Sequence, residues 1–523
     1  MELELKKTGQ VFYDMTARST VIHEQTCEVI VSDSQPDILR IAGANGCAMC
    51  NAPRADTRGA LLGGSVHAAV LYLPEDGGDV CCIPVKMEFS YPIELAQSPR
   101  DGEGAGSVLH GGAELVSIEA KVLNPRKVLV RAELKLWAAR AERVEFELCT
   151  DAAASPELAV ELLRESYTAR LLCSAGRRAF AVEDTFDLPA SRPAAAELLY
   201  TGVSVEAGDY NVIGRRVIFR GTLHLSLTYR TTGGEIAGYS TSAQFSQVAE
   251  LDDLEDGAEC VVRLSPSEFE ASLVQNGEGR TVEFTAGVEA QLEAYAERRL
   301  EAITDLYSTS MRAAVDVRPC TFTTLYGRSV LRAQARCSAE TARQVLETRG
   351  CEAGLRQMRL SRGDSGELML SGEAEARLGY IDDAGELCQL RCRVPAEVDA
   401  GGLEVDFDRG DSLLVDAHAE NFAASPSAGT GAELRFDVVC EVTHLRPLVI
   451  GAVAGAQLEP EPEDAPARPS VVLRVPERGE TLWQTAKRYC ATVAEIAAAN
   501  SLEDADPLAG APENRMLLIP RRR

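Results

Sequence analysis

The chain has 523 residues, of which 45% are hydrophobic and 25% are charged. This composition excludes an intrinsically disordered chain, and the length exceeds what one hydrophobic core supports. With 80 acidic and 53 basic side chains, the formal net charge is −27. Such a field repels the phosphates of nucleic acids and of anionic membranes, so nucleic acid is excluded as a non-specific partner.

The first residues do not have the pattern of an export signal. Residues 1–7 include no apolar run behind a basic start, which a secretory signal requires. No stretch reaches the roughly 18 apolar residues of a membrane span. The 15 cysteines are odd in number, and a chain of this length folds without disulfides. We therefore expect a cytoplasmic protein with reduced thiols and no membrane insertion.

A nine-residue pattern that starts with glycine and ends with tyrosine occurs three times. It spans residues 64–72, 221–229 and 372–380. Apolar and polar residues alternate in it, and a glycine-containing turn and a second extended run follow each copy, which predicts a β-hairpin. A further alternating run indicates a strand with one buried face. This run lies at 128–137, 282–295 and 434–444.

These repeats predict a mainly β fold of three tandem β-rich domains. Their expected bounds are 1–155, 156–315 and 316–452. Pro36 and Pro193 follow short β-like runs at matching places in the first two copies, and the third copy diverges there.

One long helix is expected between the first two domains, at the start of the second. It covers 156–167, where Ser155 supplies the N-cap and the apolar residues have helical spacing. After the third domain, residues 453–470 are rich in proline and acidic residues, and they are expected to form an extended linker.

Residues 471–523 have a pattern of their own. A β-like run opens this segment and another closes it. Thr481 and Thr492 each predict the start of a short helix, because Gln or Glu stands three residues later and completes a capping box. Asn500 suits the left-handed position that ends the second helix. The predicted order is strand, helix, helix, strand, which makes a small βααβ module.

This module resembles a LysM domain. The residues that carry the resemblance are Gly479-Glu480-Thr481-Leu482-Trp483, then Ala486, Tyr489, Thr492, Val493, Ile496, Asn500 and Leu518-Ile519-Pro520. The resemblance implies a ligand groove between the loop that opens the first helix and the loop that follows the second. By position, the groove residues are Gly479, Glu480, Thr481, Leu482, Asn500, Ser501 and Leu502.

Free backbone amides at a helix start and a small polar loop can hydrogen-bond the N-acetyl groups of a glycan. The alternative for each groove residue is that it only caps a helix or turns the chain.

The chain as a whole resembles the SPOCS-domain proteins of endospore-forming bacteria, of the SipL type. The glycine–tyrosine repeats carry this resemblance over about 20–450. The resemblance implies a spore coat morphogenetic protein in the mother-cell cytoplasm, at the forespore surface. It also implies that the LysM-like module binds a protein partner, the coat-basement ATPase known as stage IV sporulation protein A.

Two short motifs suggest chemistry at first sight. Cys47 and Cys50 form the only CxxC motif, and the nearby Cys81 and Cys82 could complete a zinc site. No second CxxC follows, so buried reduced thiols are the main expectation, with redox activity as an alternative. Residues 363–366 read Gly-Asp-Ser-Gly, as in a serine-protease nucleophile segment, but they lie in a predicted turn without a matching histidine.

Other side chains are expected to be structural. His67 and His224 occupy equivalent repeat positions, where the third copy has Glu375, and are expected on polar strand faces. Trp137 and Trp483 are expected to be packing anchors. No phosphate-binding loop or catalytic cluster is present in the sequence. We therefore expect no enzyme activity, no metal and no cofactor.

Two functions compete. The repeats, the linker and the cytoplasmic start favour a scaffold in spore coat assembly whose module docks an ATPase. The LysM resemblance also favours a peptidoglycan-binding protein that grips N-acetylglucosamine. A wall hydrolase would need a catalytic cluster in the first 450 residues, and the sequence has none.

Overall fold

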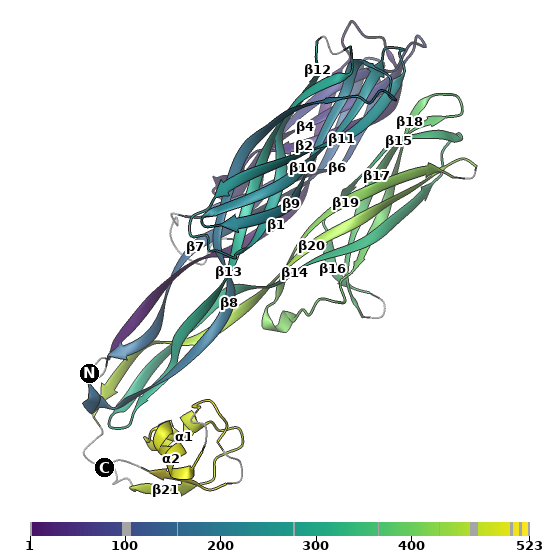
Figure 1. Cartoon of the computed structure of the whole chain (residues 1–523). Coiled ribbons are helices and arrows are strands. Elements are labelled where there is room, and N and C mark those ends of the chain that lie inside the picture. The colour runs from purple at the N-terminus through teal and green to yellow at the C-terminus, as the bar shows by residue number, and fades with distance from the viewer. Residues whose placement is uncertain are drawn as a thin grey trace.

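The computed structural model describes residues 3–96, 106–153, 155–275, 278–363, 366–427, 429–460, 469–502, 506–511 and 515–520. Nearly all of its regular structure is β-strand, and two short helices lie in the C-terminal module (Figure 1). The predicted mainly β fold class is therefore confirmed.

The strands before the module form three successive sets with nearly the same order. The first set is β1 (Glu4–Ile30), β2 (Ile38–Cys50), β3 (Arg54–Asp56), β4 (Gly59–Pro74), β5 (Cys81–Glu94), β6 (Val108–Asn124) and β7 (Lys127–Ala153). The second set is β8 (Val160–Asp187), β9 (Ala195–Ile213), β10 (Arg216–Thr231), β11 (Ile236–Glu250), β12 (Glu259–Leu273) and β13 (Thr281–Ser308). The third set is β14 (Arg312–Ala339), β15 (Val345–Leu355), β16 (Arg359–Arg362), β17 (Leu368–Asp382), β18 (Leu387–Asp399), β19 (Ser412–Pro426) and β20 (Ala432–Glu459).

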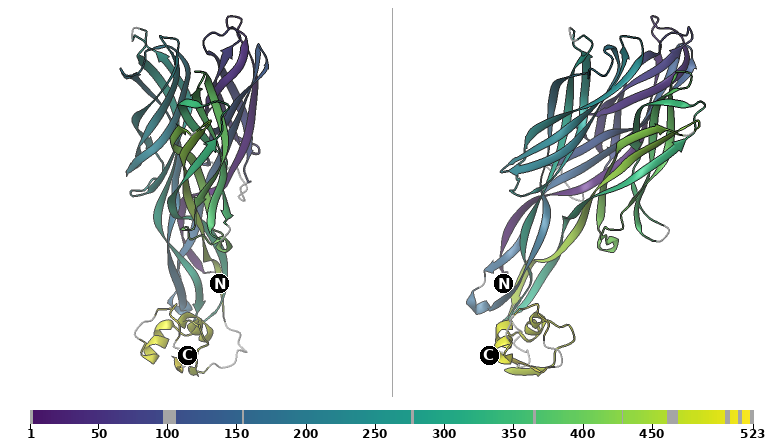
Figure 2. Two further views of the ribbon diagram at one scale, coloured as in Figure 1. Left: turned by 90° about the vertical axis from the view of Figure 1, so that its right-hand side faces the viewer. Right: turned by 45° about the vertical axis from the view of Figure 1, so that its right-hand side comes forward.

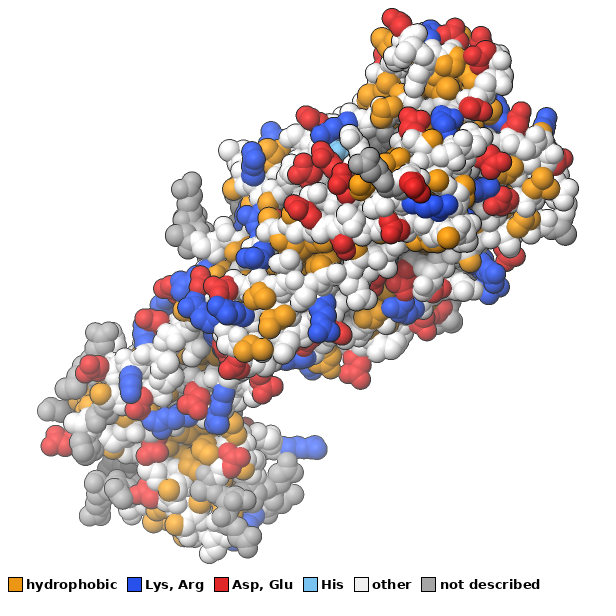
Figure 3. Space-filling model, turned by 45° about the horizontal axis from the view of Figure 1, so that its top comes forward, with side chains coloured by type: hydrophobic (Ala, Val, Ile, Leu, Met, Phe, Trp, Pro, Cys, Tyr) orange, Lys and Arg blue, Asp and Glu red, His pale blue; other side chains and the backbone are white. Residues whose placement is uncertain are grey.

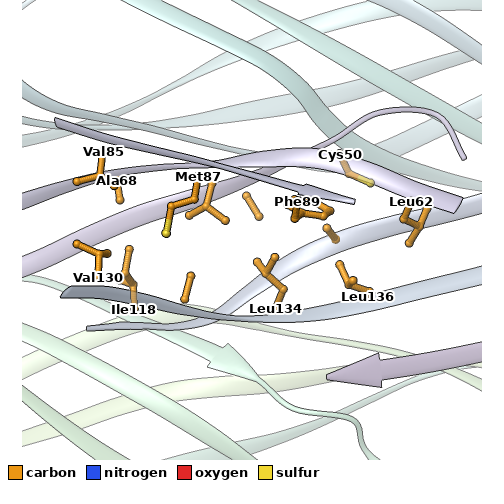
Figure 4. Close-up of a cluster of buried hydrophobic side chains, with 14 of the residues drawn as sticks. Cys50, Leu62, Ala68, Val85, Met87, Phe89, Ile118, Val130, Leu134 and Leu136 are labelled. Atoms are coloured by element: carbon orange, nitrogen blue, oxygen red, sulfur yellow. The ribbon is translucent and has the colours of Figure 1, made fainter. Parts of the chain in front are cut away.

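Each set folds into a β-sandwich. In the first, the sheet of β2, β4, β3 and β5 packs against β1, β7 and β6. In the second, β9, β10 and β11 pack against β8, β13 and β12, and in the third, β15 to β18 pack against β14, β20 and β19. Apolar side chains from both layers meet in each core, and Figure 4 shows Val85, Met87 and Phe89 facing Ile118 and Leu134.

The nine-residue patterns lie on the central strands β4, β10 and β17. The closing tyrosines pair across the predicted hairpins, Tyr72 with Cys81, Tyr229 with Ala237 and Tyr380 with Cys388. The three hairpins are therefore confirmed. The further alternating runs lie within β7, β13 and β20, which confirms those strands as well.

The repeated glycine is required by close approach of neighbouring atoms. A Cβ built on each would overlap a neighbour, the Met49 carbonyl oxygen for Gly64, the Phe245 ring for Gly221 and the Met358 sulfur for Gly372. Strand glycines commonly mark such close approaches.

The repeated tyrosine anchors a proline loop in the first two sandwiches. Tyr72 donates its hydroxyl to the carbonyl oxygen of Pro36 at 3.0 Å, and Tyr229 donates to that of Pro193 at 3.2 Å. Both rings are fully buried. The two prolines that stood at matching places in the sequence thus make the same contact in the structure.

The first and last strands of each set are longer than a sandwich requires. Each has 27 or 28 residues. They pair antiparallel over nearly their whole length, and beyond the sandwiches the three pairs continue as a stalk (Figures 1 and 2). The stalk has its own core, in which Phe12, Leu300, Phe322 and Ile450 come from all three sets.

A buried charge cluster joins the three sandwiches. Arg263 on β12 donates to Glu293 on β13 at 2.8 Å and to Asp416 on β19 at 2.8 Å. Arg18 on β1 also pairs with Asp416, and the imidazole of His110 on β6 lies 3.2 Å from Glu293. Each set of strands therefore contributes a charged side chain to one network.

Trp137 on β7 packs against this cluster. It is 9% exposed, and the guanidinium groups of Arg18 and Arg263 lie 5.0 and 5.9 Å from its ring centroid. Cations over an indole face are attracted by its quadrupole. The expectation that Trp137 is a packing anchor is confirmed.

Exposed charges of both signs are interspersed over the three sandwiches, which together form the trunk of the molecule, and over the stalk (Figure 3). The net charge is nevertheless −27. Some pair across strands, as Arg216 does with Glu250 at 2.9 Å and Arg391 with Glu119 at 2.8 Å. Exposed pairs of this kind contribute about 0–1 kcal/mol each. The stability of the fold therefore rests on its cores rather than on surface ion pairs.

The helix predicted over 156–167 is wrong. Residues Pro156–Leu158 form only one 3-10 turn, and β8 begins at Val160. Val160 pairs with Ser308, and the following residues continue along β13. Apolar residues at helical spacing also suit a strand that is buried on parts of both faces, so tertiary pairing overrides local propensity.

The linker predicted over 453–470 begins later than expected. β20 continues to Glu459, because Val453, Ala456 and Leu458 are buried in the stalk and pair with β14. Residues 461–468 lie outside the described residues. The predicted boundary between 315 and 316 also falls inside a strand, β14.

The close approach at Gly221 predicts that alanine has different effects on the free energy of unfolding at Gly221 and at Gly238. Gly221→Ala should lower the free energy of unfolding by about 1–3 kcal/mol through overpacking. Gly238→Ala on the partner strand β11 is the matched control, because its Cβ would meet its nearest neighbour at 3.7 Å. Alanine there should be neutral or stabilise by about 0.5 kcal/mol. Thermal unfolding measures both, and equal effects would contradict the close-contact explanation.

The charge cluster predicts a loss of stability in acid. Burial alone would raise the pKa of Glu293. The charge of Arg263 and the hydrogen bond with His110 outweigh burial and lower this pKa to about 2. The folded protein therefore binds fewer protons than the unfolded chain, and this stabilisation is present above about pH 4 and lost as pH falls towards 2.

Glu293→Gln should flatten this acid limb, by on the order of 3 kcal/mol in denaturant unfolding measured from pH 5 to pH 2. Glu301→Gln, an exposed change on the same strand, should keep the wild-type dependence. A Glu293→Gln curve parallel to wild type would show that the cluster does not titrate in this range.

Candidate binding site in the C-terminal module

The C-terminal module consists of β21 (Val471–Arg474), α1 (Leu482–Tyr489), α2 (Val493–Asn500) and β22 (Leu517–Pro520). The predicted strand, helix, helix, strand order is confirmed. β21 pairs antiparallel with β22, and both helices begin with the predicted capping boxes. The core of the module contains Leu482, Trp483, Ala486, Val493, Ile496, Leu517 and Ile519.

Gly479 and Glu480 shape the turn before α1. Gly479 is exposed and has a φ of 79°, a left-handed conformation that suits glycine. Glu480 is buried, and its carboxylate accepts from the backbone N–H of Glu477 at 3.0 Å and pairs with Arg474 at 3.2 Å. This carboxylate holds the turn and is not free for a ligand.

The backbone amides at the start of α1 are occupied. The N–H of Leu482 donates to the carbonyl of Ala509 at 3.1 Å, and the N–H of Trp483 donates to that of Pro507 at 2.9 Å. Thr481 caps the helix, and the Leu482 side chain is buried. The expected free amides are therefore a wrong prediction, because the loop before β22 covers the helix start.

Asn500 is a structural residue of α2. It is buried, and its side chain donates to the carbonyls of Ile496 at 2.8 Å and Leu518 at 2.7 Å and accepts from the N–H of Leu518 at 2.8 Å. The left-handed position predicted for Asn500 belongs to Ser501, which has a φ of 53°. The helix runs one residue further because Asn500 joins it to β22.

Ser501 and Leu502, the last two predicted groove residues, come directly after Asn500 in the chain. Ser501 is exposed, whereas Leu502 packs against the module core and donates its N–H to the carbonyl of Ala497 at 3.0 Å. The structure places all seven predicted residues in one small module. Gly479 and Ser501 are the two that are exposed.

Sequence reasoning missed a contact between the module and the stalk. The indole N–H of Trp483 donates to Asp305 of β13 at 2.8 Å, and the ammonium of Lys487 donates to the same carboxylate at 2.6 Å. The Tyr307 hydroxyl donates to the carbonyl of Ala491 at 2.8 Å, and its ring lies 4.8 Å from that of Trp483 in a T-shaped arrangement.

One signal pointed towards this contact. A tryptophan on a short amphipathic helix needs a hydrogen-bond acceptor for its N–H when it is buried. The sequence could not show that the acceptor stood 178 residues away. Trp483, 4% exposed, is an anchor for the module core and for the stalk at once.

The cysteines do not form a metal site. Cys50 pairs with Gly64 and Cys82 with Leu71, so they lie seven residues apart along β4, about 23 Å. Burial raises the pKa of Cys50 to about 12 and raises that of Cys47. Both are therefore buried thiols, as expected. Among the described residues, no group of three or more His, Cys, Asp or Glu could hold a metal ion.

The two histidines at equivalent repeat positions differ in surroundings. His224 is exposed and lies 3.2 Å from Glu206, as expected for a polar strand face. His67 is half-buried and lines a cleft of about 510 Å³ between β4, β5 and the Ser267–Glu270 part of β12. Burial and Lys86 lower the pKa of His67, so the imidazole there is neutral near pH 7.

The Gly-Asp-Ser-Gly motif at 363–366 is described only at its two glycines. Asp364 and Ser365 of the Gly-Asp-Ser-Gly segment are outside the described residues. No helix within the described ranges has the length and apolar character that a membrane span requires.

Residues 195–274 match the family described as SipL, SPOCS domain. The chain therefore contains a segment of the SPOCS-domain type. No curated protein and no solved structure matches the chain. The match extends from β9 through β12, and so contains the second glycine–tyrosine hairpin.

The SPOCS match covers the second sandwich only. The first and third sandwiches share its strand order, its central hairpin and its pair of long strands. The first and third sandwiches therefore repeat the architecture of the one that contains the match. The resemblance of residues 471–520 to LysM domains stays a prediction, supported by the βααβ order.

The role of Asn500 predicts opposite effects at two neighbouring positions. Asn500→Ala would leave the Leu518 backbone unpaired and should destabilise the module by about 1–3 kcal/mol. Ser501→Gly should stabilise it by about 0.4–1 kcal/mol, because glycine suits a φ of 53°. Hydrogen exchange of the α1 and α2 amides in the full chain measures both. Unchanged exchange in Asn500→Ala would contradict the structural role.

Proposed function

We propose that this chain is a non-catalytic scaffold for spore coat assembly and that its C-terminal module docks a coat-basement ATPase similar to stage IV sporulation protein A. The SPOCS match at residues 195–274 is the observation that carries the proposal, because it links the chain to sporulation. The proposed place of action is the mother-cell cytoplasm at the forespore surface.

The architecture supports a scaffold. Three sandwiches share one stalk, and a small module lies at the stalk end, where its apolar core also includes Leu163 and Tyr307 of the stalk (Figures 1 and 2). The long paired strands give a stiff body, and the module adds a second surface at a defined position. A rigid body that carries a separate docking unit suits a protein that positions others.

The module supports a protein partner more than a glycan. The amides of Leu482 and Trp483 and the carboxylate of Glu480 are engaged inside the module, so a sugar would have to displace them. The βααβ order still favours the competing function, in which the module binds peptidoglycan through N-acetylglucosamine. The test therefore includes both ligands.

Removing residues 469–523 should abolish binding of the purified ATPase. The full chain and the shortened chain are compared by biolayer interferometry on the ATPase, and by co-sedimentation with purified wall sacculi. The full chain should bind the ATPase and stay in the supernatant with sacculi. The shortened chain should keep the thermal transition of the trunk, because the sandwich cores do not include the module.

Binding of the ATPase by the shortened chain would place the docking surface in the sandwiches instead. Sedimentation of the full chain with sacculi, without ATPase binding, would support the peptidoglycan-binding function and overturn the scaffold.

A further inference from the structure

Among the described residues, the contact between the module and the stalk includes one set of polar and aromatic groups. Asp305 and Tyr307 of β13 contact Trp483 and Lys487 of α1 and the carbonyl of Ala491. Leu163 of β8 joins the same apolar cluster. Two chemical features of the stalk are therefore recognised, a carboxylate and an aromatic ring with a hydroxyl.

The spacing of these two features is that of one strand face. Asp305 and Tyr307 are two residues apart, so both point to the same side of β13, while Leu306 is buried in the stalk core. A register shift between Ile303 and Asp305 precedes them. Such a bulge re-aims the side chains that follow it, here towards the module.

The receiving surface on the module matches these features. Trp483 offers its N–H and Lys487 its ammonium to one carboxylate, which makes two charge-assisted hydrogen bonds. The rings of Trp483 and Tyr307 pack in a T-shaped arrangement, and the Ala491 carbonyl accepts a hydrogen bond from the Tyr307 hydroxyl. A carboxylate and a phenol on one strand face satisfy all of these groups together.

The contact joins two buried rings to an ion pair at its edge, since Trp483 and Tyr307 are 4% and 3% exposed. In the ion pair, the Lys487 side chain is 43% exposed and that of Asp305 is 21% exposed, so solvent screens their attraction in part. At the rim, burial raises the pKa of Glu161, and Glu495 of the module raises it further, which is a repulsion between stalk and module. A partner that offers the same carboxylate and phenol can therefore compete with the stalk for these groups.

We propose that the surface formed by Trp483 and Lys487 of α1 and by the Ala491 carbonyl is a protein-docking surface for an extended strand with an Asp-x-Tyr pattern. In the free chain the stalk's own Asp305 and Tyr307 occupy it. A partner that presents the same pair competes with the stalk, and this last step rests on the proposed function. The stalk thereby sets how much of the module is available.

The docking itself can be tested in the full chain without any partner. The chain has two tryptophans, so 5-fluorotryptophan labelling gives two ¹⁹F resonances, which Trp483→Phe assigns. Asp305→Asn and Tyr307→Phe should each move the Trp483 resonance and leave that of Trp137 in place. Glu301→Gln, an exposed change on the same strand with the same loss of charge, should move neither.

A peptide of residues 301–310 then probes the specificity. Added to the Asp305→Asn chain, it should return the Trp483 resonance towards its wild-type position. The same peptide with Asn in place of Asp305 should not. An unchanged Trp483 resonance in Asp305→Asn would overturn the docking, and equal effects of the two peptides would overturn the role of the carboxylate.

The regulatory step is tested by affinity for the ATPase. Asp305→Asn leaves the module surface intact but weakens the contact of the stalk with that surface. The affinity for the ATPase should therefore increase by about three- to tenfold. Glu301→Gln should bind as wild type does. An unchanged or weaker affinity for Asp305→Asn would overturn competition by the stalk. Because the ¹⁹F experiment contains no partner, failure of the docking and failure of the proposed function give different results.

Discussion

Pairing of the first strand of each repeat with its last strand is the constraint on which the rest of the structure depends. β1 with β7, β8 with β13, and β14 with β20 stay in antiparallel register along nearly their full lengths. One end of each pair forms a sandwich layer and the other end enters the stalk. Because the same strands build both parts, the orientation of the sandwiches and the position of the module are set together.

This arrangement explains why a charged network can lie at the centre of the trunk. Removing charges from water is costly unless each finds a partner in good geometry. Arg263 meets that condition only when Glu293 of its own repeat and Asp416 of the third repeat are both in place. The network therefore favours one arrangement of the three repeats over alternatives in which apolar faces alone would meet. The three repeats therefore pack into one unit rather than forming independent domains in tandem.

The sequence predicted what local pattern controls and missed what distant pairing controls. The glycine of each hairpin is visible in the sequence because close approach restricts its position to one residue type, and in the first two hairpins the hydroxyl bonds of Tyr72 and Tyr229 restrict the tyrosine position as well. The strand that begins at Val160 has the local pattern of a helix, and only its pairing with β13, more than 100 residues away, makes it a strand. In the module, the capping boxes of Thr481 and Thr492 were predictable from four residues each. The occupation of the Leu482 amide and the contact of Trp483 with Asp305 were not, because both depend on segments that only the fold brings near.

The long strands also have a mechanical consequence. A strand of 28 residues spans about 90 Å, and the free end of β20, which leads to the module, lies at the stalk end far from the sandwich loops (Figure 1). A pull on the module against an anchored trunk would load the β14–β20 ladder along its length. In this shear direction the hydrogen bonds share the force, whereas a pull across the ladder would open them one after another. The paired strands of the stalk therefore resist a pull along their length more than a pull across the ladder.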